Sequence, residues 1–310
     1  MGNLIDRLLG DFGVEKFLQA HFNRLPFSRP DHASDLRDCL TWDVVRAVLE
    51  RGKSVLRVVN DGKMVLDQEA LSFSQAQEYY RTGHTLLLRY AERSHPILAE
   101  IAGEFRQFFG APVDIQAYCT PPGGQAFLWH FDIEEVFIIQ TQGSKHYTIR
   151  QNTVHPYPVM SSVVPDMGYE RERSPLKLEV TLRQGDWLYI PSGWWHIART
   201  LEESMHLSVG VMPITCLDLL DFLKIHLAPM ELWRVRLPTL TLAASERQEY
   251  YAGLMGALSQ ALDRQMKRPD TLEGFIRHLH GDPSATEQVR LEMPENSEAR
   301  DAEPSGTLGT

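Results

Sequence analysis

The sequence predicts a mainly β domain, a sandwich or a barrel, with helical segments before and after it. Between residues 113 and 212, short runs rich in valine, isoleucine and aromatic residues follow one another. Turn-forming clusters separate these runs, at Pro121-Pro122-Gly123-Gly124, Gln142-Gly143-Ser144 and Gln184-Gly185-Asp186. Many short strands divided by regular turns are typical of β-sandwiches and barrels. In residues 1–33 and 214–282, apolar residues recur at helical spacing instead.

Residues 1–33 form the predicted N-terminal helical arm. Apolar side chains recur at helical spacing in residues 4–9 and again in residues 14–22. A residue before proline avoids the helical conformation, so Pro26 and Pro30 predict an extended exit from the arm. We therefore expect one or two short helices that pack against a larger body and carry no chemistry of their own.

The chain beyond the arm first mixes strands and helices. A strand over residues 54–59 runs into Asn60-Asp61-Gly62-Lys63, a turn sequence typical of β-hairpins. A short helix is expected over residues 75–80, with Ser74 as its N-cap and Gln77 completing a capping box. This part of the chain therefore supplies a hairpin and a capped helix to the domain.

The central domain is predicted to span residues 34–213. Its remaining elements are a helix over residues 96–109 and strands over residues 85–90, 113–119, 127–131, 136–140, 145–150, 178–182, 187–190, 195–199 and 205–212. Residues 153–177 form a long insertion that contains prolines. Within a compact domain such a loop is usually functional, for example as a lid over a site.

Two histidines and one aspartate are the candidate metal ligands. Residues i and i+2 of a strand point to the same face, so His130 and Asp132 can reach one metal from a single strand or its end. His196 follows an aromatic-rich run that we expect on the opposite wall. Two imidazoles and one carboxylate are the facial triad that binds non-haem Fe(II) and leaves coordination positions open. Taken alone, His130 would be a strand histidine with a satisfied hydrogen bond, and Asp132 a turn or solvent carboxylate.

Composition excludes several classes of protein. The 310 residues carry a net charge of −10, which argues against binding of nucleic-acid phosphates and is compatible with a basic protein or peptide partner. No apolar run approaches the roughly 18 residues of a membrane span, and the N-terminus does not read as a secretory signal. Cys39, Cys119 and Cys216 are isolated, so we expect reduced thiols in a cytoplasmic protein.

Several spaced motifs carry a resemblance to a known family. They are Tyr118-Cys119-Thr120-Pro121-Pro122, Gln125, His130-x-Asp132, Val136-Phe137-Ile138-Ile139-Gln140, Gly143-Ser144-Lys145, and Gly185-Asp186-x-Leu188-Tyr189-Ile190-Pro191 followed by His196. In this order they resemble the JmjC hydroxylases, and among those the ribosomal-oxygenase branch. The resemblance covers about residues 15–213, since Phe17 to Pro26 occupies the place of that branch's aromatic-and-proline entry segment.

The resemblance implies a double-stranded β-helix, a jelly-roll or cupin core whose interior holds Fe(II) and 2-oxoglutarate. It carries the iron ligands onto His130, Asp132 and His196. It carries the partner of the 2-oxoglutarate carboxylate onto Lys145, where a fixed cation would offset the desolvation of a dicarboxylate. Read without the resemblance, Lys145 is an ordinary surface lysine after a Gly-Ser turn.

Other residues are expected around the cosubstrate. The resemblance implies Tyr118 and Ser208 as hydrogen-bonding neighbours, although Ser208 also fits simple alternation with apolar residues on a strand. His206 shares the face of Ser208, and we expect it to be a core or neighbouring group and not a fourth ligand. One position departs from the family, because Tyr147 stands where relatives often have tryptophan.

The implied activity is that of an Fe(II)- and 2-oxoglutarate-dependent dioxygenase that uses O2 to hydroxylate an amino-acid side chain. The expected substrate is a protein, ribosomal by resemblance, or a peptide natural-product precursor. Demethylation of a methylated lysine or arginine would use the same oxidant. The alternative from another class is a non-catalytic metal-binding cupin scaffold, against which the intact set of candidate ligands and Lys145 speaks. A metal-dependent enzyme without 2-oxoglutarate would not need Lys145.

Residues 214–282 form a predicted helical module, and residues 283–310 a predicted disordered tail that is rich in glutamate, serine and proline. Apolar residues at helical spacing predict helices over residues 217–227, 250–262 and 272–279. The resemblance implies that this region mediates dimerisation, so a homodimer through these helices is expected. The chain is too short for the complete winged-helix domain that follows in the family.

Overall fold

The computed structural model describes residues 3–68, 71–154, 156–159, 175–238 and 243–281. The chain divides into two compact units, residues 1–213 and 214–310. No helix among these described residues is long and apolar enough to cross a membrane. The predicted tail lies outside the described residues, as does most of the 153–177 insertion.

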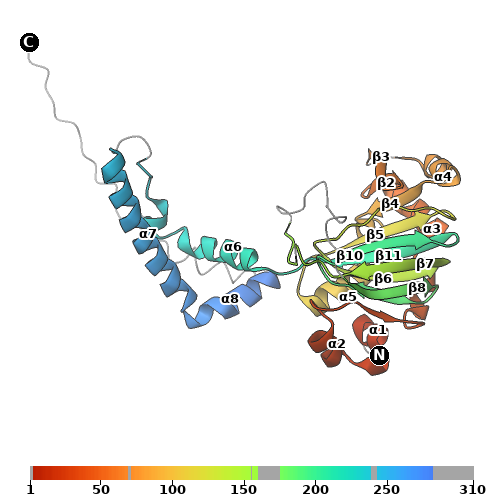
Figure 1. Ribbon diagram of the computed structural model, residues 1–310, viewed down its shortest axis with the longest axis horizontal. Coiled ribbons are helices and arrows are strands. Elements are labelled where there is room, and N and C mark those ends of the chain that lie inside the picture. Colours follow the sequence, from red (N-terminus) through yellow and green to blue (C-terminus); the bar gives the residue numbers. More distant parts are fainter. Residues whose placement is uncertain (1–2, 69–70, 155, 160–174, 239–242, 282–310) are drawn as a thin grey trace, which may run out of the picture. The chain divides into compact units, whose positions relative to one another are not determined.

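The first unit is built on two antiparallel sheets (Figure 1). The larger has eight strands in the order β1-β9-β6-β11-β5-β4-β2-β3, with bounds Phe27–Arg29, Trp187–Ile190, Glu135–Gln142, Ser204–Val211, Val113–Thr120, Thr85–Arg89, Val55–Asn60 and Lys63–Gln68. The smaller has three, in the order β10-β7-β8, with bounds Trp195–Thr200, Ser144–Arg150 and Leu176–Arg183. The predicted mainly β, jelly-roll class is therefore confirmed.

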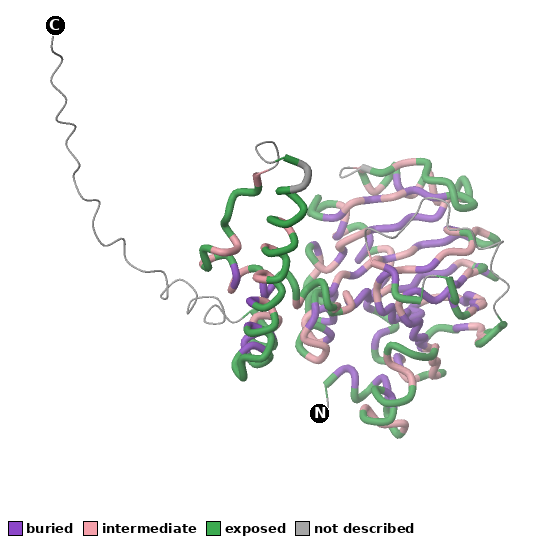
Figure 2. Tube along the Cα trace, turned by 60° about the vertical axis from the view of Figure 1, so that its left-hand side comes forward, coloured by how far each residue is buried: buried purple, intermediate pink, exposed green. Residues whose placement is uncertain are grey.

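Helices pack on one face of the larger sheet. They are α1 (Leu4–Leu9), α2 (Val14–Ala20), α3 (Trp42–Arg51), α4 (Phe73–Arg81) and α5 (Pro96–Phe109), with short 3-10 turns at Gly10–Phe12, Ser34–Cys39 and Ala91–Arg93. The arm, α3 and α5 share one large apolar core with this sheet. Figure 2 shows buried residues running along the strands. The helices thus close the sheet's outer face and leave its inner face to the second sheet.

Strand β6 shows how the two faces are used. Phe137 and Ile139 belong to the core beneath the helices, whereas Val136 and Ile138 belong to a second core between the two sheets. This alternation is the period of two that a β-strand imposes. Because both faces of the strand are covered, it reads as a continuous apolar run in the sequence. The space between the sheets holds the candidate site.

The hairpin prediction is confirmed, and one capping prediction is wrong. Strands β2 and β3 are joined by Asp61 and Gly62, both with positive φ, as a tight hairpin turn requires. Helix α4, however, begins two residues earlier than expected. Its N-cap is Ser72, whose hydroxyl accepts from the Gln75 backbone N–H at 3.3 Å, and not Ser74 with Gln77. The earlier start places Phe73 in the helix, where its ring contacts Trp42.

The strand predicted over residues 127–131 is also wrong. The segment is a loop that makes one isolated β-bridge, between His130 and His196. Strand β10 forms its full ladder with β7, so along its other edge it meets this loop at a single point. Strand β1 lies in the extended exit predicted between Pro26 and Pro30, although no strand was predicted there. Helix α3 was not predicted, although Thr41 at its start and Gly52 at its end are ordinary capping residues.

The second unit consists of helices. They are α6 (Cys216–Leu227), a 3-10 turn (Glu231–Arg234), α7 (Ala244–Met266) and α8 (Pro269–Leu279). Thr215 and Asp218 form a capping box at the start of α6. Phe222 packs against Phe275 with ring centroids 5.6 Å apart, which joins α6 to α8. The three helices predicted here are therefore present.

Candidate metal centre

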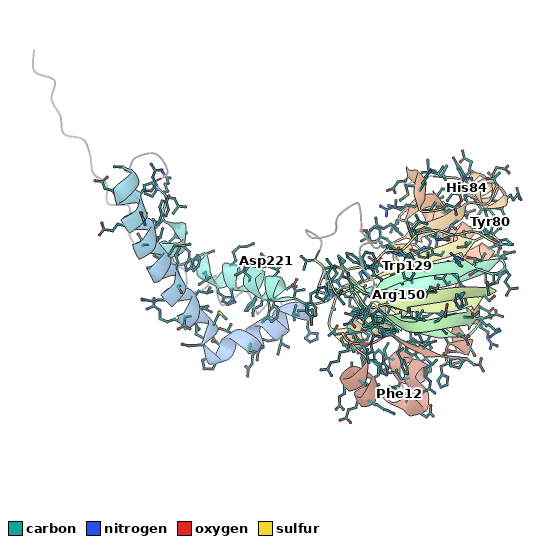
Figure 3. The ribbon with its side chains drawn as sticks, in the orientation of Figure 1. Phe12, Tyr80, His84, Trp129, Arg150 and Asp221 are labelled. Atoms are coloured by element: carbon teal, nitrogen blue, oxygen red, sulfur yellow. The ribbon has the colours of Figure 1, made fainter. Side chains whose placement is uncertain are left out.

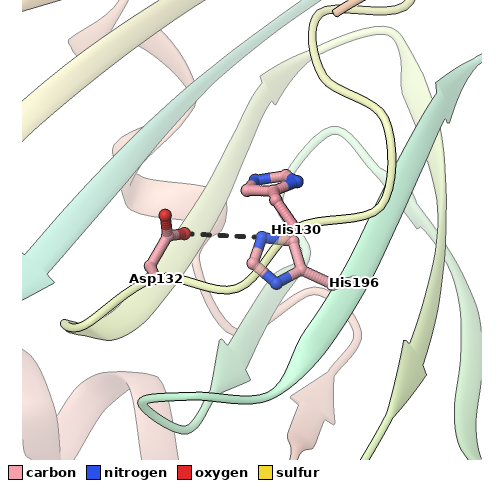
Figure 4. A group of neighbouring side chains, drawn as sticks. All are labelled: His130, Asp132 and His196. Atoms are coloured by element: carbon pink, nitrogen blue, oxygen red, sulfur yellow. Dashed lines mark ion pairs between the residues drawn. The ribbon is translucent and has the colours of Figure 1, made fainter. Parts of the chain in front are cut away.

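His130, Asp132 and His196 meet at one point between the two sheets (Figure 4). Their ligand atoms all lie within 4.8 Å of one another. Nε2 of His196 is 3.4 Å from a carboxylate oxygen of Asp132, and the two imidazole centroids are 4.2 Å apart. The three residues that the sequence predicted as ligands are therefore close enough to bind one metal ion.

Backbone hydrogen bonds hold the ligand-bearing loop in place. The N–H of His130 donates to the carbonyl of His196 at 3.2 Å, and the N–H of His196 donates back at 2.8 Å. The N–H of Gly193 donates to the carbonyl of Asp132 at 2.8 Å. These bonds position the backbone of each ligand although the segment is not a regular strand. The loop therefore presents His130 and Asp132 to one point, as the predicted strand was expected to do.

Trp129, the residue before His130, also anchors the loop. The indole of Trp129 lies 5.9 Å from the guanidinium of Arg150, at the end of β7 (Figure 3). A guanidinium over an indole face is an attractive arrangement. The loop is thus held at two places, on β10 through His130 and on β7 through Trp129.

Two carbonyl groups decide which nitrogen of each histidine faces the centre. Nδ1 of His130 lies 2.8 Å from the carbonyl oxygen of Leu128, and Nδ1 of His196 lies 3.0 Å from that of Trp194. A carbonyl oxygen can only accept, so each Nδ1 carries the proton. Each Nε2 is then left with a lone pair for a metal, which is the usual arrangement around a ligating histidine.

The charges at the centre also suit metal binding. Burial, together with repulsion from His196, lowers the pKa of His130 to about 4. Burial acts to raise the pKa of Asp132, but the neighbouring imidazoles of His196 and His130 outweigh it and lower this pKa to about 2. At neutral pH His130 is therefore neutral and Asp132 ionised, the forms that bind a metal.

One pocket beside this centre collects all six residues predicted for the site. It is lined by Tyr118, His130, Asp132, Lys145, His196 and Ser208, and also by Ala126, Phe127, Val136, Ile138, Tyr147, Ala198 and His206. The geometry therefore gathers the predicted set in one place. The parts that these residues play in binding remain predictions.

Lys145 is an almost completely buried cation, with only 2% of its surface exposed. Its Nζ lies 3.4 Å from the hydroxyl of Thr120 and faces the Tyr118 ring at 5.6 Å from the centroid. No described carboxylate pairs with it. Burial lowers the pKa of Lys145 to about 7. An isolated buried charge is costly, so this position favours an anionic ligand.

Tyr118 and Ser208 lie on neighbouring strands of the same wall. The hydroxyl of Tyr118 donates to Gln116 at 3.2 Å, and its ring stacks on His206 with centroids 4.6 Å apart. Ser208 on β11 is in register with Gln116 on β5. Thr120, which the sequence analysis missed, follows Tyr118 by two residues and so shares its face, a signal that was available in the sequence.

Two further carboxylates near the metal ligands were not predicted. The Glu134 carboxylate packs against Gly210 on β11. A Cβ atom at position 210 would collide with it. Burial, followed by the Asp114 carboxylate, raises the pKa of Glu134 to about 8. Burial, followed by Glu92, also raises the pKa of Asp114. At neutral pH the Glu134 carboxyl is therefore mostly protonated and uncharged.

Comparison with known proteins finds similarity over the part of the chain that holds this site. Residues 92–219 match the model of the JmjC domain. The chain is 33% identical to "Ribosomal oxygenase 2" of Bos taurus over 175 residues, which is 56% of this chain and 36% of that protein. It is 30% identical to "Ribosomal oxygenase 1" of Gallus gallus over 179 residues, 57% of this chain and 28% of that protein. The chain thus spans about a third of the length of these relatives.

A further relative and a solved structure agree with these matches. The chain is 30% identical over 152 residues to "Bifunctional lysine-specific demethylase and histidyl-hydroxylase NO66" of Aedes aegypti, 48% of this chain and 24% of that protein. The fold matches YcfD, a ribosomal oxygenase from Escherichia coli, in its complex with cobalt and 2-oxoglutarate, at TM-score 0.59 and 20% identity, over 86% of this chain and 70% of that one. Residues 92–219 are thus similar to the JmjC domain, and the chain is similar in sequence to ribosomal oxygenases.

Proposed function

We propose that this chain is an Fe(II)- and 2-oxoglutarate-dependent oxygenase that hydroxylates an amino-acid side chain of a protein or peptide. The observation that carries the proposal is the convergence of His130, Asp132 and His196 beside the buried Lys145, which no described carboxylate pairs with. A facial triad leaves positions for a chelating cosubstrate. The oxygenase and hydroxylase names of the relatives support the same reading.

In this proposal His130, Asp132 and His196 hold the iron, and Lys145 holds a carboxylate of 2-oxoglutarate. Iron bound there supplies the oxidising chemistry, in which 2-oxoglutarate and O2 give succinate, CO2 and an oxidant for a substrate C–H bond. The chain's own part is to orient these groups. The Leu128 and Trp194 carbonyls set the imidazoles, Lys145 fixes the cosubstrate by charge, and the apolar core between the sheets keeps bulk water away.

Tyr118 and Ser208 complete the cosubstrate site in this proposal. Both line the pocket, and the ring of Tyr118 lies beside the Lys145 ammonium. The Lys145 position also speaks against a cupin scaffold that only stores metal, because no carboxylate among the described residues pairs with that buried charge.

The substrate class that fits best is a basic protein segment, such as those of ribosomal proteins. The chain carries a net charge of −10, which would attract a cationic segment. A direct search would incubate the loaded enzyme with basic proteins and peptides and look by mass spectrometry for one added oxygen atom. Loss of a methyl group instead would favour demethylation.

We also propose a cytoplasmic location and a homodimer. Cys39, Cys119 and Cys216 are free thiols, as expected of a protein from a reducing compartment. The helices of residues 214–281 expose large apolar side chains, among them Leu217, Leu220, Met255 and Leu272. A surface of that kind favours association with a second copy.

The test of the cofactor site is an anaerobic titration of the protein with Fe(II) and 2-oxoglutarate. We expect the weak visible charge-transfer band of the iron–2-oxoglutarate chelate in the wild type. The band should weaken in Lys145→Ala, which loses the carboxylate partner, and vanish in His130→Ala, which loses an iron ligand. A wild-type protein that binds iron but gives no band with 2-oxoglutarate would contradict the oxygenase proposal and favour the scaffold.

A further inference from the structure

Tyr147 is a buried tyrosine at the centre of the proposed cosubstrate pocket. It lies in the middle of β7, in register with Val180 on β8 and Ala198 on β10. It follows Lys145 by two residues, so both side chains enter the space between the sheets. Both line the same pocket, and only 2% of Tyr147 is exposed.

The Tyr147 hydroxyl has no hydrogen-bond partner among the residues that the structure describes. Such a group destabilises a fold, since in water it would be hydrogen-bonded. Burial raises the pKa of Tyr147, so the hydroxyl keeps its proton and remains a donor. A buried donor without an acceptor among the described residues, in a pocket with a buried cation, points to an acceptor that a bound ligand provides.

The neighbours of Tyr147 are not that acceptor. The Lys145 ammonium only donates, and the Tyr147 hydroxyl is within hydrogen-bond reach of no other polar atom among the described residues. The ring of His206 lies edge-on with centroids 6.5 Å apart, and its Nδ1 also has no partner among the described residues. The pocket therefore gathers a cation and two unpartnered polar groups. A carboxylate, with two oxygens and several lone pairs, is the ligand chemistry that satisfies such a set.

We propose that the Tyr147 hydroxyl donates a hydrogen bond to the 2-oxoglutarate carboxylate that Lys145 binds. This role rests on the proposed function, because it requires 2-oxoglutarate in the pocket. The residue belongs to cosubstrate binding and not to metal binding, since a phenol that keeps its proton is a hydrogen-bond donor and not a metal ligand. Its hydroxyl is left unpaired in the free protein and satisfied on binding, so it destabilises the empty site and strengthens the filled one.

Tyr147→Phe removes the hydroxyl and keeps the ring, so two measurements test the role. The first is the dissociation constant of 2-oxoglutarate, titrated anaerobically with Mn(II) in place of iron. We expect it to rise about tenfold, the loss of one hydrogen bond to a charged group. The second is the melting temperature of the metal-free, cosubstrate-free protein. We expect it to stay level or rise, because the variant no longer buries an unpaired hydroxyl.

Tyr189→Phe is the matched control. Its hydroxyl is equally buried but donates to Glu135 and accepts from the backbone N–H of Asn23, outside the pocket. We expect this variant to melt at a lower temperature and to bind 2-oxoglutarate as the wild type does.

The outcomes separate the two proposals. A wild type that binds Mn(II) but not 2-oxoglutarate overturns the proposed function and the role of Tyr147 with it. A wild type that binds 2-oxoglutarate, with Tyr147→Phe binding it within a factor of about two, overturns the role of Tyr147 alone. A fall in the melting temperature of Tyr147→Phe as large as that of Tyr189→Phe also overturns it, because the hydroxyl would then have a partner in the free protein.

Discussion

At the scale of single residues, Lys145 has the strongest consequence for how the site behaves. Its pKa is lowered to about 7, whereas a lysine in water titrates near 10.5. The cause is burial, which disfavours the charged form. A bound carboxylate acts in the opposite direction, since it favours the ammonium. The cosubstrate and a proton should therefore bind to this site together.

We predict that 2-oxoglutarate binding takes up close to one proton at pH 8 and weakens as the pH rises. Below pH 7 Lys145 is already protonated, so affinity is level there. Above pH 7 the free site must first be protonated, and the dissociation constant should rise by up to tenfold for each pH unit. Calorimetry in two buffers of different ionisation enthalpy measures the proton uptake.

Lys145→Met is the control for this linkage. It removes the titrating group, so both the proton uptake and the pH dependence of the remaining weak binding should disappear. Proton uptake that persists in Lys145→Met would assign the linkage to another group.

The lowered pKa of Lys145 also predicts how the free protein responds to pH. Below pH 7 the lysine is charged in the folded and in the unfolded protein, and folding carries the full cost of burying the charge. Between about pH 7 and 10.5 only the unfolded protein remains charged, so that cost shrinks. The free energy of unfolding should rise more with pH in the wild type than in Lys145→Met, as denaturant melts at pH 7 and 9 can measure. Equal slopes in the two proteins would contradict this.

At the scale of elements, the β2–β3 hairpin supports the loop that carries the ligands. The N–H of Asp61 donates to the carbonyl of Gln125 at 3.0 Å, and the N–H of Gly62 donates to that of Ala126 at 2.9 Å. A Cβ on Gly62 would lie 2.9 Å from Cγ of Leu128, so the loop passes directly over the turn. An element far from the metal in sequence thus sets the position of His130.

We predict that Gly62→Ala lowers metal affinity about tenfold, the size of effect expected when a supporting group of a metal site is disturbed. The added methyl group pushes on Leu128 and shifts the loop. Gly52→Ala is the control, since Gly52 also has positive φ, at 64°, but no other atom within 4 Å of the added carbon. Both variants should lose about 1 kcal/mol of stability from backbone strain. Only Gly62→Ala should bind Mn(II) more weakly.

The double variant Gly62→Ala with Leu128→Ala relieves the contact and should recover much of the metal affinity. Equal Mn(II) affinity in Gly62→Ala and Gly52→Ala would mean that the hairpin does not support the loop. A direct binding titration of each purified variant distinguishes these results.

The strands could be predicted from the sequence because each carries its own signal, in β-branched and aromatic residues bounded by turns. The loop that carries the metal ligands could not be predicted, because Phe127 to Phe131 has the composition of a strand. It is a loop because β10 forms its ladder with β7 and pairs with this segment only at His130. The residue types and order of the metal ligands were visible in the sequence. The carbonyls that orient them and the Glu134 carboxylate were not, because side-chain identity does not reveal backbone or loop placement.

At the scale of the whole molecule, the two units have different proposed roles. The first unit contains every residue proposed for the chemistry. In the second, apolar side chains remain exposed on the helices, with Leu220 at 51% and Met255 at 65%. Figure 2 shows these helices exposed along much of their length. An apolar surface that the unit itself does not cover is the basis of the proposed homodimer.

We predict that Leu220→Glu converts a dimer into a monomer, because a charge in an apolar interface remains without a partner. Sedimentation velocity at several protein concentrations measures the change. Leu201→Glu is the control, since Leu201 is 62% exposed but lies in the first unit. It should leave the sedimentation coefficient unchanged. A wild type that is monomeric at all concentrations would contradict the homodimer.

The reciprocal hydrogen bonds between His130 and His196 also bear on whether folding or metal binding comes first. The two histidines come from distant parts of the sequence, and they face each other only after the strands between them have paired. Metal binding is then coupled to completed folding. An unfolded chain keeps His196 apart from His130 and Asp132, so we expect it to bind iron weakly. The topology of the domain thus protects the unfolded polypeptide from the oxidising chemistry that the folded protein is proposed to perform.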